Sequence, residues 1–266
     1  MPCRFNRRHG ALLPLATLLT ALSAPAHAQQ ADAGATADYP SPMRLIGDIG
    51  LGVDNAPPVG RGQSHAVNAI PYANADYGRA FARIDTVGLR VLPAGYGYLE
   101  LVGKFNEDGY TPLRTALGRF DQRKTSVPLG LGTLQVTPVG AFFVNVFRDV
   151  GRSKGNLADL IYAAEIDAGP LAIYPQAGLE YQSSAYTRYF YGVSGDEARR
   201  TGVAAYQPGA ATNPFAALFI EAHVGGNWYV NANLRRTWLG GSVGASALVA
   251  RHTADTGLVA LSYRFK

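Results

Sequence analysis

The sequence contains a single cysteine, Cys3, which lies in an N-terminal region that we expect to be removed. We therefore expect neither a disulfide nor a lipid anchor in the mature chain. No later stretch has about 18 uninterrupted apolar residues, so no transmembrane helix is expected. The His and Cys spacings of a metal site are missing. The Gly95-x-Gly97 and Gly130-x-Gly132 pairs lack the following helix that a phosphate-binding loop needs. We predict no metal and no cofactor.

Residues 1–28 have the features of a secretory signal peptide. Arg4, Arg7 and Arg8 are basic, residues 11–22 are apolar, and residues 26–28 form an A-x-A cleavage site. Residues 29–42 are rich in Ala, Gly and Pro, so we expect a flexible N-terminal segment on the periplasmic side. Removing the leader takes away three Arg and no acidic residue, so the formal charge falls from +5 to +2. That small charge gives little reason to expect a nucleic-acid partner.

The segment 227–238 alternates between apolar and polar side chains, with Trp228 and Trp238 at the two ends of the apolar face. A period of two is typical of a strand with one apolar and one polar side. At about 3.3 Å per residue and a tilt of roughly 40°, the two indole rings stand about 25 Å apart, the height of the apolar band of an outer-membrane barrel. We interpret both tryptophans as membrane-interface residues. An edge strand of a soluble sandwich is the alternative.

Short and long connections alternate along residues 43–266. Short turns are predicted at residues 93–94, 137–138, 169–170 and 226–227. This alternation is typical of bacterial barrels, which have short periplasmic turns and long extracellular loops. An open sheet in lipid would leave unpaired edges, so the sheet must close. The predicted fold is an all-β, closed antiparallel transmembrane β-barrel.

The number of strands depends on how residues 66–77 are interpreted. Pro71 argues against a central strand there, because proline cannot donate a ladder hydrogen bond. We therefore place residues 66–77 in the first outer loop and residues 81–92 in one strand, which gives ten strands. If residues 66–77 form a strand, parity requires one more, and the number is twelve.

Several predicted strands carry polar side chains on the face opposite their aliphatic ones, and we expect these in the lumen. The set is Glu100, Lys104, Glu180, Glu221, His223 and Arg235. His223 shares a face with Glu221, so the two could serve as a general base and its orienting carboxylate. A lumenal polar network that includes Arg235 explains the same residues, and no Ser is obviously placed beside His223. We therefore predict that the protein is not an enzyme. Large polar side chains in a narrow ten-stranded lumen also argue against a wide pore.

Two predicted loops carry candidate binding residues. Arg119, Arg123 and Lys124 could face anionic lipopolysaccharide, but we favour a solvated charged loop. Tyr186, Tyr189 and Tyr191 could form a sugar-binding platform, but we favour an aromatic girdle with a structured loop above it.

Two stretches resemble the MipA/OmpV family of outer-membrane proteins. One runs from the segment YFYGVS to the segment YQPG, and the second is the C-terminal LSYRF. The matching positions are Tyr189, Tyr191, Gly192, Val193, Gly202, Tyr206, Pro208 and Gly209 in the first stretch, and Leu261, Tyr263 and Phe265 in the second. The second stretch also resembles the C-terminal signal read by the barrel-assembly machinery.

The resemblance implies a location in the bacterial outer membrane and a scaffold role. The namesake of the family is described as linking a murein-degrading lytic transglycosylase to a murein synthase. Other members are described as porin-like proteins or adhesins, so a small channel or a surface adhesin is the alternative. The expected environment is outer-membrane lipid and lipopolysaccharide.

Overall fold

The computed structural model describes residues 43–55, 60–61, 67–106 and 108–266. The predicted signal peptide and the predicted flexible segment, residues 1–28 and 29–42, lie outside these ranges. No helix in the described part of the chain is long and apolar enough to cross a membrane.

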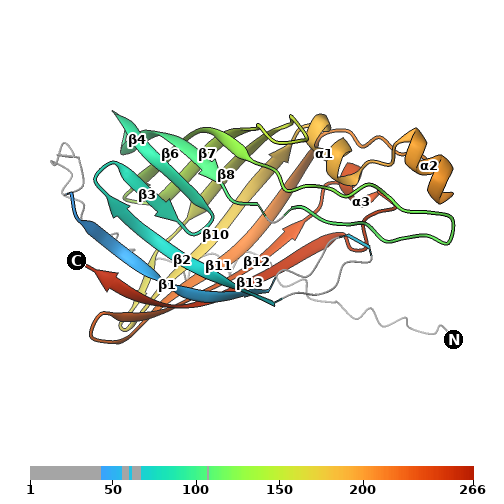
Figure 1. The fold of residues 1–266 in the computed structure, drawn as a ribbon. Coiled ribbons are helices and arrows are strands. Elements are labelled where there is room, and N and C mark those ends of the chain that lie inside the picture. Colours follow the sequence, from blue (N-terminus) through green and yellow to red (C-terminus); the bar gives the residue numbers. More distant parts are fainter. Residues whose placement is uncertain (1–42, 56–59, 62–66, 107) are drawn as a thin grey trace, which may run out of the picture.

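The described residues form thirteen strand segments and three helices (Figure 1). In chain order these are β1 (Leu45–Asn55), β2 (Val67–Tyr77), β3 (Ala80–Arg83), β4 (Thr86–Ala94), β5 (Gly97–Lys104), β6 (Pro128–Thr137), β7 (Gly140–Asp149), β8 (Asn156–Ala163), β9 (Ile166–Ala168), β10 (Leu171–Gln182), α1 (Ser184–Tyr191), α2 (Gly195–Thr201), β11 (Ala211–Gly225), β12 (Trp228–Trp238), α3 (Gly241–Gly244) and β13 (Thr253–Phe265).

The sheet is antiparallel and closes on itself. Each strand pairs with its neighbour in sequence, except that β8 pairs with β10 and not with β9, and β13 pairs with β1 over residues 47–55 to complete the ring. The segments β8 and β9 both pair with the same side of β10, so they form one wall strand with an interruption at residues 164–165. Among the described residues the wall therefore has twelve strands, with β9 as the extra segment.

The predicted closed antiparallel barrel is confirmed, but the preferred number of ten strands is wrong. Residues 67–77 form wall strand β2 rather than part of a loop. The predicted single strand at 81–92 is instead two strands, β3 and β4, joined by a tight turn at Ile84 and Asp85. The number of wall strands stays even, because β2 and the additional strand from residues 80–94 raise it by two.

Pro71 is tolerated in β2 because its nitrogen faces an edge without a ladder partner. β3 pairs only with residues 74–77 of β2. The carbonyl of Ala73 accepts a hydrogen bond from Ile84 N–H on the β3 side. Backbone groups of alternate residues point to the same side of a strand, so Pro71 faces that side too. The described residues place no strand there, so no ladder bond is lost.

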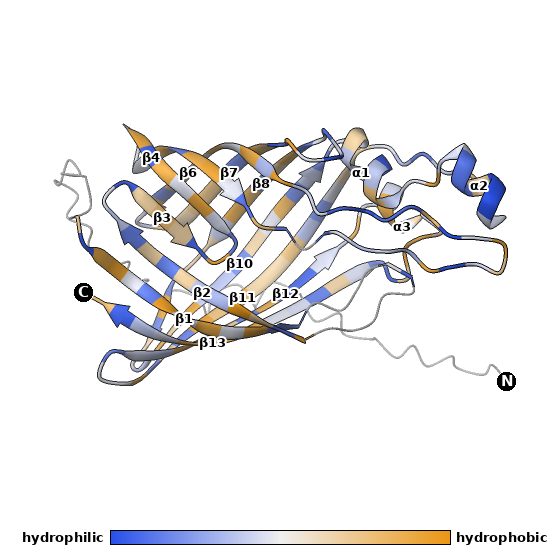
Figure 2. Ribbon diagram, viewed as in Figure 1, coloured by the Kyte–Doolittle hydropathy of each residue, from blue (hydrophilic) through white to orange (hydrophobic). Residues whose placement is uncertain are grey.

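The two ends of the barrel differ. At one end the connections are two-residue turns, and the C-terminus lies close to the start of β1 (Figure 1). At the opposite end lie the long connections and all three helices. Along the wall, hydrophobic and hydrophilic residues alternate, and α2 is strongly hydrophilic (Figure 2). Outward side chains such as Leu51 and Leu234 are exposed, whereas Phe147 and Phe219 face the interior and are buried.

A designed disulfide can test the twelve-strand wall. Val53 and Ala69 are directly paired across β1 and β2. Because the backbone groups of Ala69 face the β3 side, this is a non-hydrogen-bonded pair with an expected Cα separation of about 4.5 Å. We expect the V53C/A69C variant to oxidise readily to a disulfide, measured as protected thiols in the folded protein.

The control for this disulfide is V53C/A73C. Ala73 is paired with Ile49, four residues along the strand from the position opposite Val53, so the cysteines should stay about 13 Å apart and remain reduced. Efficient oxidation of the control, or none in V53C/A69C, would show that residues 67–77 are not in the wall.

Candidate functional site

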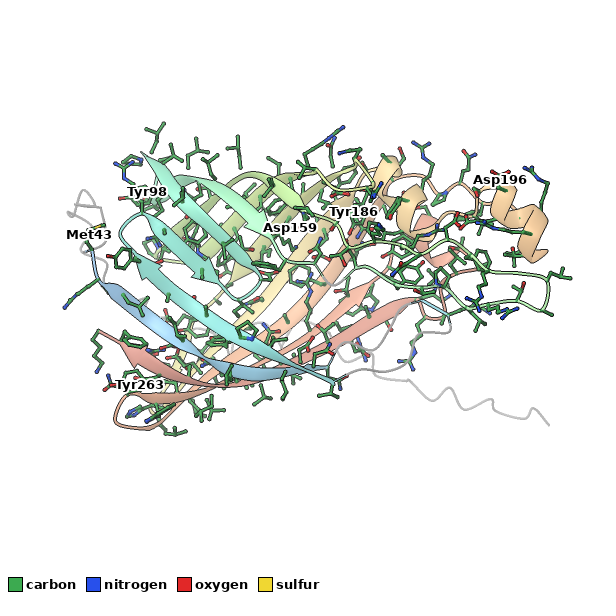
Figure 3. The ribbon with its side chains drawn as sticks, in the orientation of Figure 1. Met43, Tyr98, Asp159, Tyr186, Asp196 and Tyr263 are labelled. Atoms are coloured by element: carbon green, nitrogen blue, oxygen red, sulfur yellow. The ribbon has the colours of Figure 1, made fainter. Side chains whose placement is uncertain are left out.

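The long connections fold into a structured cap over one end of the barrel. We define the cap as residues 105–106, 108–127, 183–210 and 239–252. Its innermost element is α1, whose Tyr186 and Phe190 are 2% and 1% exposed. They pack against interior-facing side chains of four wall strands, Phe81, Val102, Phe147 and Leu157. The cap core is thus continuous with the core of the lumen, and Figure 3 shows Tyr186 at this end and Tyr263 at the opposite one.

A glycine ends α1. The N–H of Gly192 donates to the carbonyl of Arg188, and a Cβ at position 192 would lie 2.3 Å from that oxygen. Any larger residue would therefore displace the backbone at the point where the chain leaves α1. Gly202 ends α2 in the left-handed conformation, with φ of 72°, which also favours glycine.

A buried ion pair joins the first cap segment to α2. Arg123 lies 3.0 Å from Glu197 and also donates to the carbonyl of Gly192. Glu197 closes the capping box of α2 with Ser194 and accepts a further hydrogen bond from Asp121 N–H. Arg123 is therefore neither a solvated loop residue nor a residue that faces lipopolysaccharide, which were the two interpretations of the sequence, whereas Arg119 and Lys124 are exposed.

The tyrosines of the first resembling stretch hold the cap together. Tyr189 Oη accepts a hydrogen bond from Lys124 N–H, and the Tyr191 carbonyl accepts one from Ser246. Val193 and Tyr206 form a β-bridge, and Tyr206 donates to the Ser242 carbonyl. The remaining positions of this stretch lie in the same cap, with Pro208 buried and the Gly209 carbonyl accepting from Thr187. Because Tyr186 is buried, neither an exposed sugar platform nor a membrane girdle describes this cluster.

The polar residues predicted for the lumen fall into separate ion-paired groups. Lys104 pairs with Asp159 at 2.8 Å and with Glu180 at 3.6 Å, and Glu180 pairs with Arg235 at 2.7 Å. Glu100 pairs with Arg83 at 2.6 Å. Sequence reasoning missed Arg83 and Asp159. The period of two along β8 could have indicated an inward position for Asp159, whereas the four residues of β3 are too few to do so for Arg83.

A third ion-paired group lies near the two-residue turns. Arg264 contacts Asp48 and Glu221, both at 2.5 Å, and so joins β13, β1 and β11. Glu221 is therefore not an orienting carboxylate for His223. The imidazole Nε2 of His223 lies 3.0 Å from the Gly226 carbonyl, and its ring packs against Tyr229. Within the described residues no group of three or more His, Cys, Asp or Glu side chains could hold a metal ion.

The two tryptophans lie at opposite ends of β12 on the outer wall, 47% and 44% exposed. Trp228 contacts Tyr263 edge to face, and Tyr263 contacts Phe265. Leu261 is also exposed on the outside of β13. The role of these residues in membrane anchoring and barrel assembly stays a prediction.

Comparison with known proteins identifies the family of this barrel. The family model of the MltA-interacting protein MipA matches residues 49–265. The chain belongs to the MipA family. Its relatives include the MltA-interacting protein of Escherichia coli (strain K12), 28% identical over 147 residues, which are 55% of this chain and 58% of that protein. YiaT of the same strain is 23% identical over 209 residues, covering 77% and 85% of the two chains. The outer membrane protein OmpV of Vibrio cholerae is 28% identical over 130 residues, covering 48% and 50%.

This MipA-family barrel is a protein of the bacterial outer membrane. Because such barrels generally have short periplasmic turns and long extracellular loops, we expect the cap to lie on the extracellular side. The chain spans only about 58% of the length of the MltA-interacting protein that it matches. The family is named for an interaction or for the outer membrane, and not for an enzymatic activity.

The cap of this MipA-family chain should loosen in acid. Burial alone would raise the pKa of Glu197, but hydrogen bonds from Arg123 and from the N–H groups of Ser194 and Asp121 outweigh it and lower the pKa below its ordinary value. A lowered folded-state pKa stabilises the fold above the unfolded pKa, about 4.3, and this contribution is lost as the pH falls through the folded value. We expect cap amide protection, corrected for intrinsic exchange, to fall below about pH 4.3.

The matched variant for the acid effect is E197Q, which cannot titrate. Its cap protection should be lower than that of the wild type at neutral pH and nearly independent of pH across the same range. An equal acid response in E197Q would assign the loosening to another group.

Proposed function

We propose that this protein is a non-enzymatic outer-membrane scaffold that holds a murein-degrading lytic transglycosylase and a murein synthase at the periplasmic face. The observation that carries the proposal is the match to the MltA-interacting protein together with membership of its family. The family match extends through nearly the whole wall, including the strands whose turns face the periplasm. A scaffold needs such a fixed position in the membrane and no catalytic group of its own.

The lumen supports a scaffold better than a porin-like channel. Twelve strands enclose a wider interior than the predicted ten, so wall geometry alone no longer keeps the pore narrow. Ion pairs instead join distant parts of the wall, because Lys104 on β5 contacts Asp159 on β8 and Glu180 on β10. Glu180 in turn contacts Arg235 on β12, and α1 packs into the mouth of the barrel at the cap end. Paired charges bind one another rather than a passing solute. An adhesin would use the same exposed loops, but no feature of the cap favours a specific surface ligand.

The same geometry supports the absence of enzymatic activity. Arg264 binds Glu221, and the imidazole of His223 contacts a backbone carbonyl. His223 and Glu221 therefore do not form the general base and orienting carboxylate that a hydrolase would need. Outer-membrane hydrolysis would need a nucleophile, a base and an orienting group within hydrogen-bond reach of one another. A hydrolase activity that is lost in H223A or E221A without unfolding would overturn this part of the proposal.

The contact surface for a murein enzyme is limited on the barrel itself. The periplasmic turns at Gly78, Tyr96, Val139, Gly169 and Gly226 are short and spread around the rim. A standard interface needs about 800 Å² from each partner, which such turns cannot supply in one patch. We propose that residues 29–42, which lie outside the described residues, provide much of the contact and become ordered on binding, with modest affinity.

Deleting residues 30–38 while keeping the cleavage site tests this contact. We expect the variant to insert and stay heat-modifiable on gels, but to lose most of the murein enzymes that cross-link to the intact protein in envelopes. The control replaces residues 30–38 by a Gly/Ser segment of equal length, which keeps the spacing and should lose the partners equally. Unchanged co-purification places the contact elsewhere. If no murein enzyme co-purifies with the intact protein, the scaffold role itself fails.

A further inference from the structure

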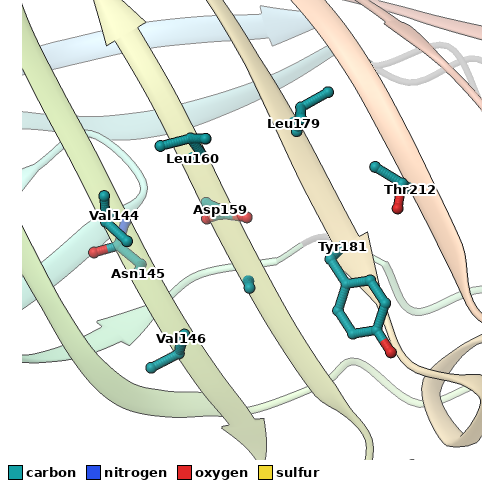
Figure 4. Close-up of a pocket in the computed structure, with 9 residues that line it drawn as sticks. Val144, Asn145, Val146, Asp159, Leu160, Leu179, Tyr181 and Thr212 are labelled. Atoms are coloured by element: carbon teal, nitrogen blue, oxygen red, sulfur yellow. The ribbon is translucent and has the colours of Figure 1, made fainter.

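The outer wall of the barrel carries an apolar depression of about 270 Å³ across β7, β8 and β10 (Figure 4). Strand register explains it. Ala158 is paired with Val146 on β7 and with Tyr181 on β10, so a methyl group lies between two larger outward side chains. The next outward row holds Val144, Leu160 and Leu179, and the lining is completed by Asn145, Asp159 and Thr212. Because the outer face of a membrane barrel contacts lipid, this depression borders hydrocarbon.

A group of three basic residues, Arg148, Arg152 and Lys154, lies beside this depression on its extracellular side. Arg148 follows Val146 by two residues on the same face of β7, so it stands about 7 Å further along the strand. It is paired with Asn156 and donates a hydrogen bond of 3.0 Å to the Asn156 side chain. Arg152 and Lys154 follow in the loop between β7 and β8, and all three cations are exposed.

The positive charge of this group is not neutralised locally. Asp149, the acidic residue within the run, is 0% exposed. Its carboxylate accepts hydrogen bonds from the N–H groups of Val127, Gly151 and Ser153 and so faces into the loop. Among the described residues no carboxylate forms an ion pair with Arg148, Arg152 or Lys154, whereas the exposed Arg199, Arg200 and Arg236 all have acidic partners.

We propose that this depression and its three cations form a binding site for the lipid A part of lipopolysaccharide. The apolar row from Val146 to Tyr181 takes an acyl chain, and Arg148, Arg152 and Lys154 bind a phosphate of the headgroup. Guanidinium and ammonium groups suit phosphate because both donate charge-assisted hydrogen bonds. The vertical order fits a lipid of the outer leaflet, with the chain toward the membrane centre and the phosphate toward the extracellular surface. This site is independent of the proposed scaffold role, which concerns the periplasmic end.

The test measures retained lipid. The intact purified protein is placed in phosphatidylcholine nanodiscs that contain a trace of diphosphorylated lipid A, re-extracted in detergent, and the bound lipid A per barrel is counted by mass spectrometry. We expect lipid A retention to fall by about tenfold or more in the R148A/R152A/K154A variant, because each surface cation contributes separately to binding an anionic headgroup. Filling the depression with A158F should reduce retention without changing the charge.

Two matched variants test whether the loss of lipid A depends on this site and not on any change of charge or side-chain size. R119A/K124A removes two exposed cations from the cap, away from the proposed site, and A216F adds the same ring to an exposed alanine on β11. Both should retain lipid A like the wild type. Dephosphorylated lipid A and phosphatidylglycerol should be retained weakly, and inorganic phosphate should not displace lipid A. Equal retention in R148A/R152A/K154A and the wild type, or equal retention of dephosphorylated lipid A, would overturn the proposal.

Discussion

Replacing Arg264 by Ala is expected to destabilise the whole barrel severely. Arg264 is the common partner of Asp48 and Glu221, and the Asp48 side chain is only 2% exposed. Without the guanidinium, the buried Asp48 carboxylate and the partly buried Glu221 carboxylate would face each other with no cation between them. Removing one partner of a buried ion pair typically costs about 3–5 kcal/mol. We expect a loss of at least about 3 kcal/mol in the free energy of unfolding, measured by urea titration of the detergent-folded protein.

Two further variants separate this charge effect from damage to the last strand. K266A removes a cation two residues away and should keep the wild-type midpoint, since Lys266 is exposed. D48N/E221Q/R264Q removes all three charges together and should recover most of the stability lost in R264A. If R264A unfolds at the same urea concentration as K266A, the Asp48–Arg264–Glu221 group does not hold β13 to β1.

Replacing Arg123 by Ala should release the cap while leaving the barrel wall folded. The change leaves Glu197 buried without its cation and removes the hydrogen bond to the Gly192 carbonyl at the end of α1. At a cost of about 3 kcal/mol, amide protection in the cap should fall by roughly two orders of magnitude. Hydrogen exchange followed by mass spectrometry measures this separately for the cap and for strands such as β12.

R119A is the control for R123A, because Arg119 is an exposed cation on the same cap segment. It should leave cap exchange unchanged, and R123Q/E197Q should recover part of the protection lost in R123A. An R123A cap that exchanges as slowly as the wild-type cap would show that the buried ion pair does not hold the cap to the barrel.

The wall could be predicted from the sequence because a half-buried strand has a fixed period of two. Trp228, Leu234 and Trp238 had to share one face of a strand whatever the rest of the chain did, and the structure places them on the outside. The number of strands could not be derived in the same way. Pro71 argues against a central strand, and only the arrangement of β3 shows that its nitrogen faces an edge without a ladder bond. The four residues of β3 are also too few to show a period.

The ion pairs of the lumen depend on register, which a single strand does not reveal. Arg235 is opposite Ala217 on β11 but reaches Glu180 one strand further on, and Glu221 is bound by Arg264 of β13. Likewise Asp48 and Arg264 are 216 residues apart and meet only because β13 closes against β1. The tyrosine motif was visible as a resemblance, yet its place inside the barrel mouth follows from α1, which the alternation of the strands does not predict.

The central claim is that the lumen of this barrel is blocked and does not conduct ions. Planar-bilayer recording of the intact purified protein tests it most directly. The lumenal ion pairs and the cap packed around Tyr186 and Phe190 predict no large, steady conductance at neutral pH. A large, steady conductance from the wild-type protein would contradict an occluded lumen and favour a porin-like function.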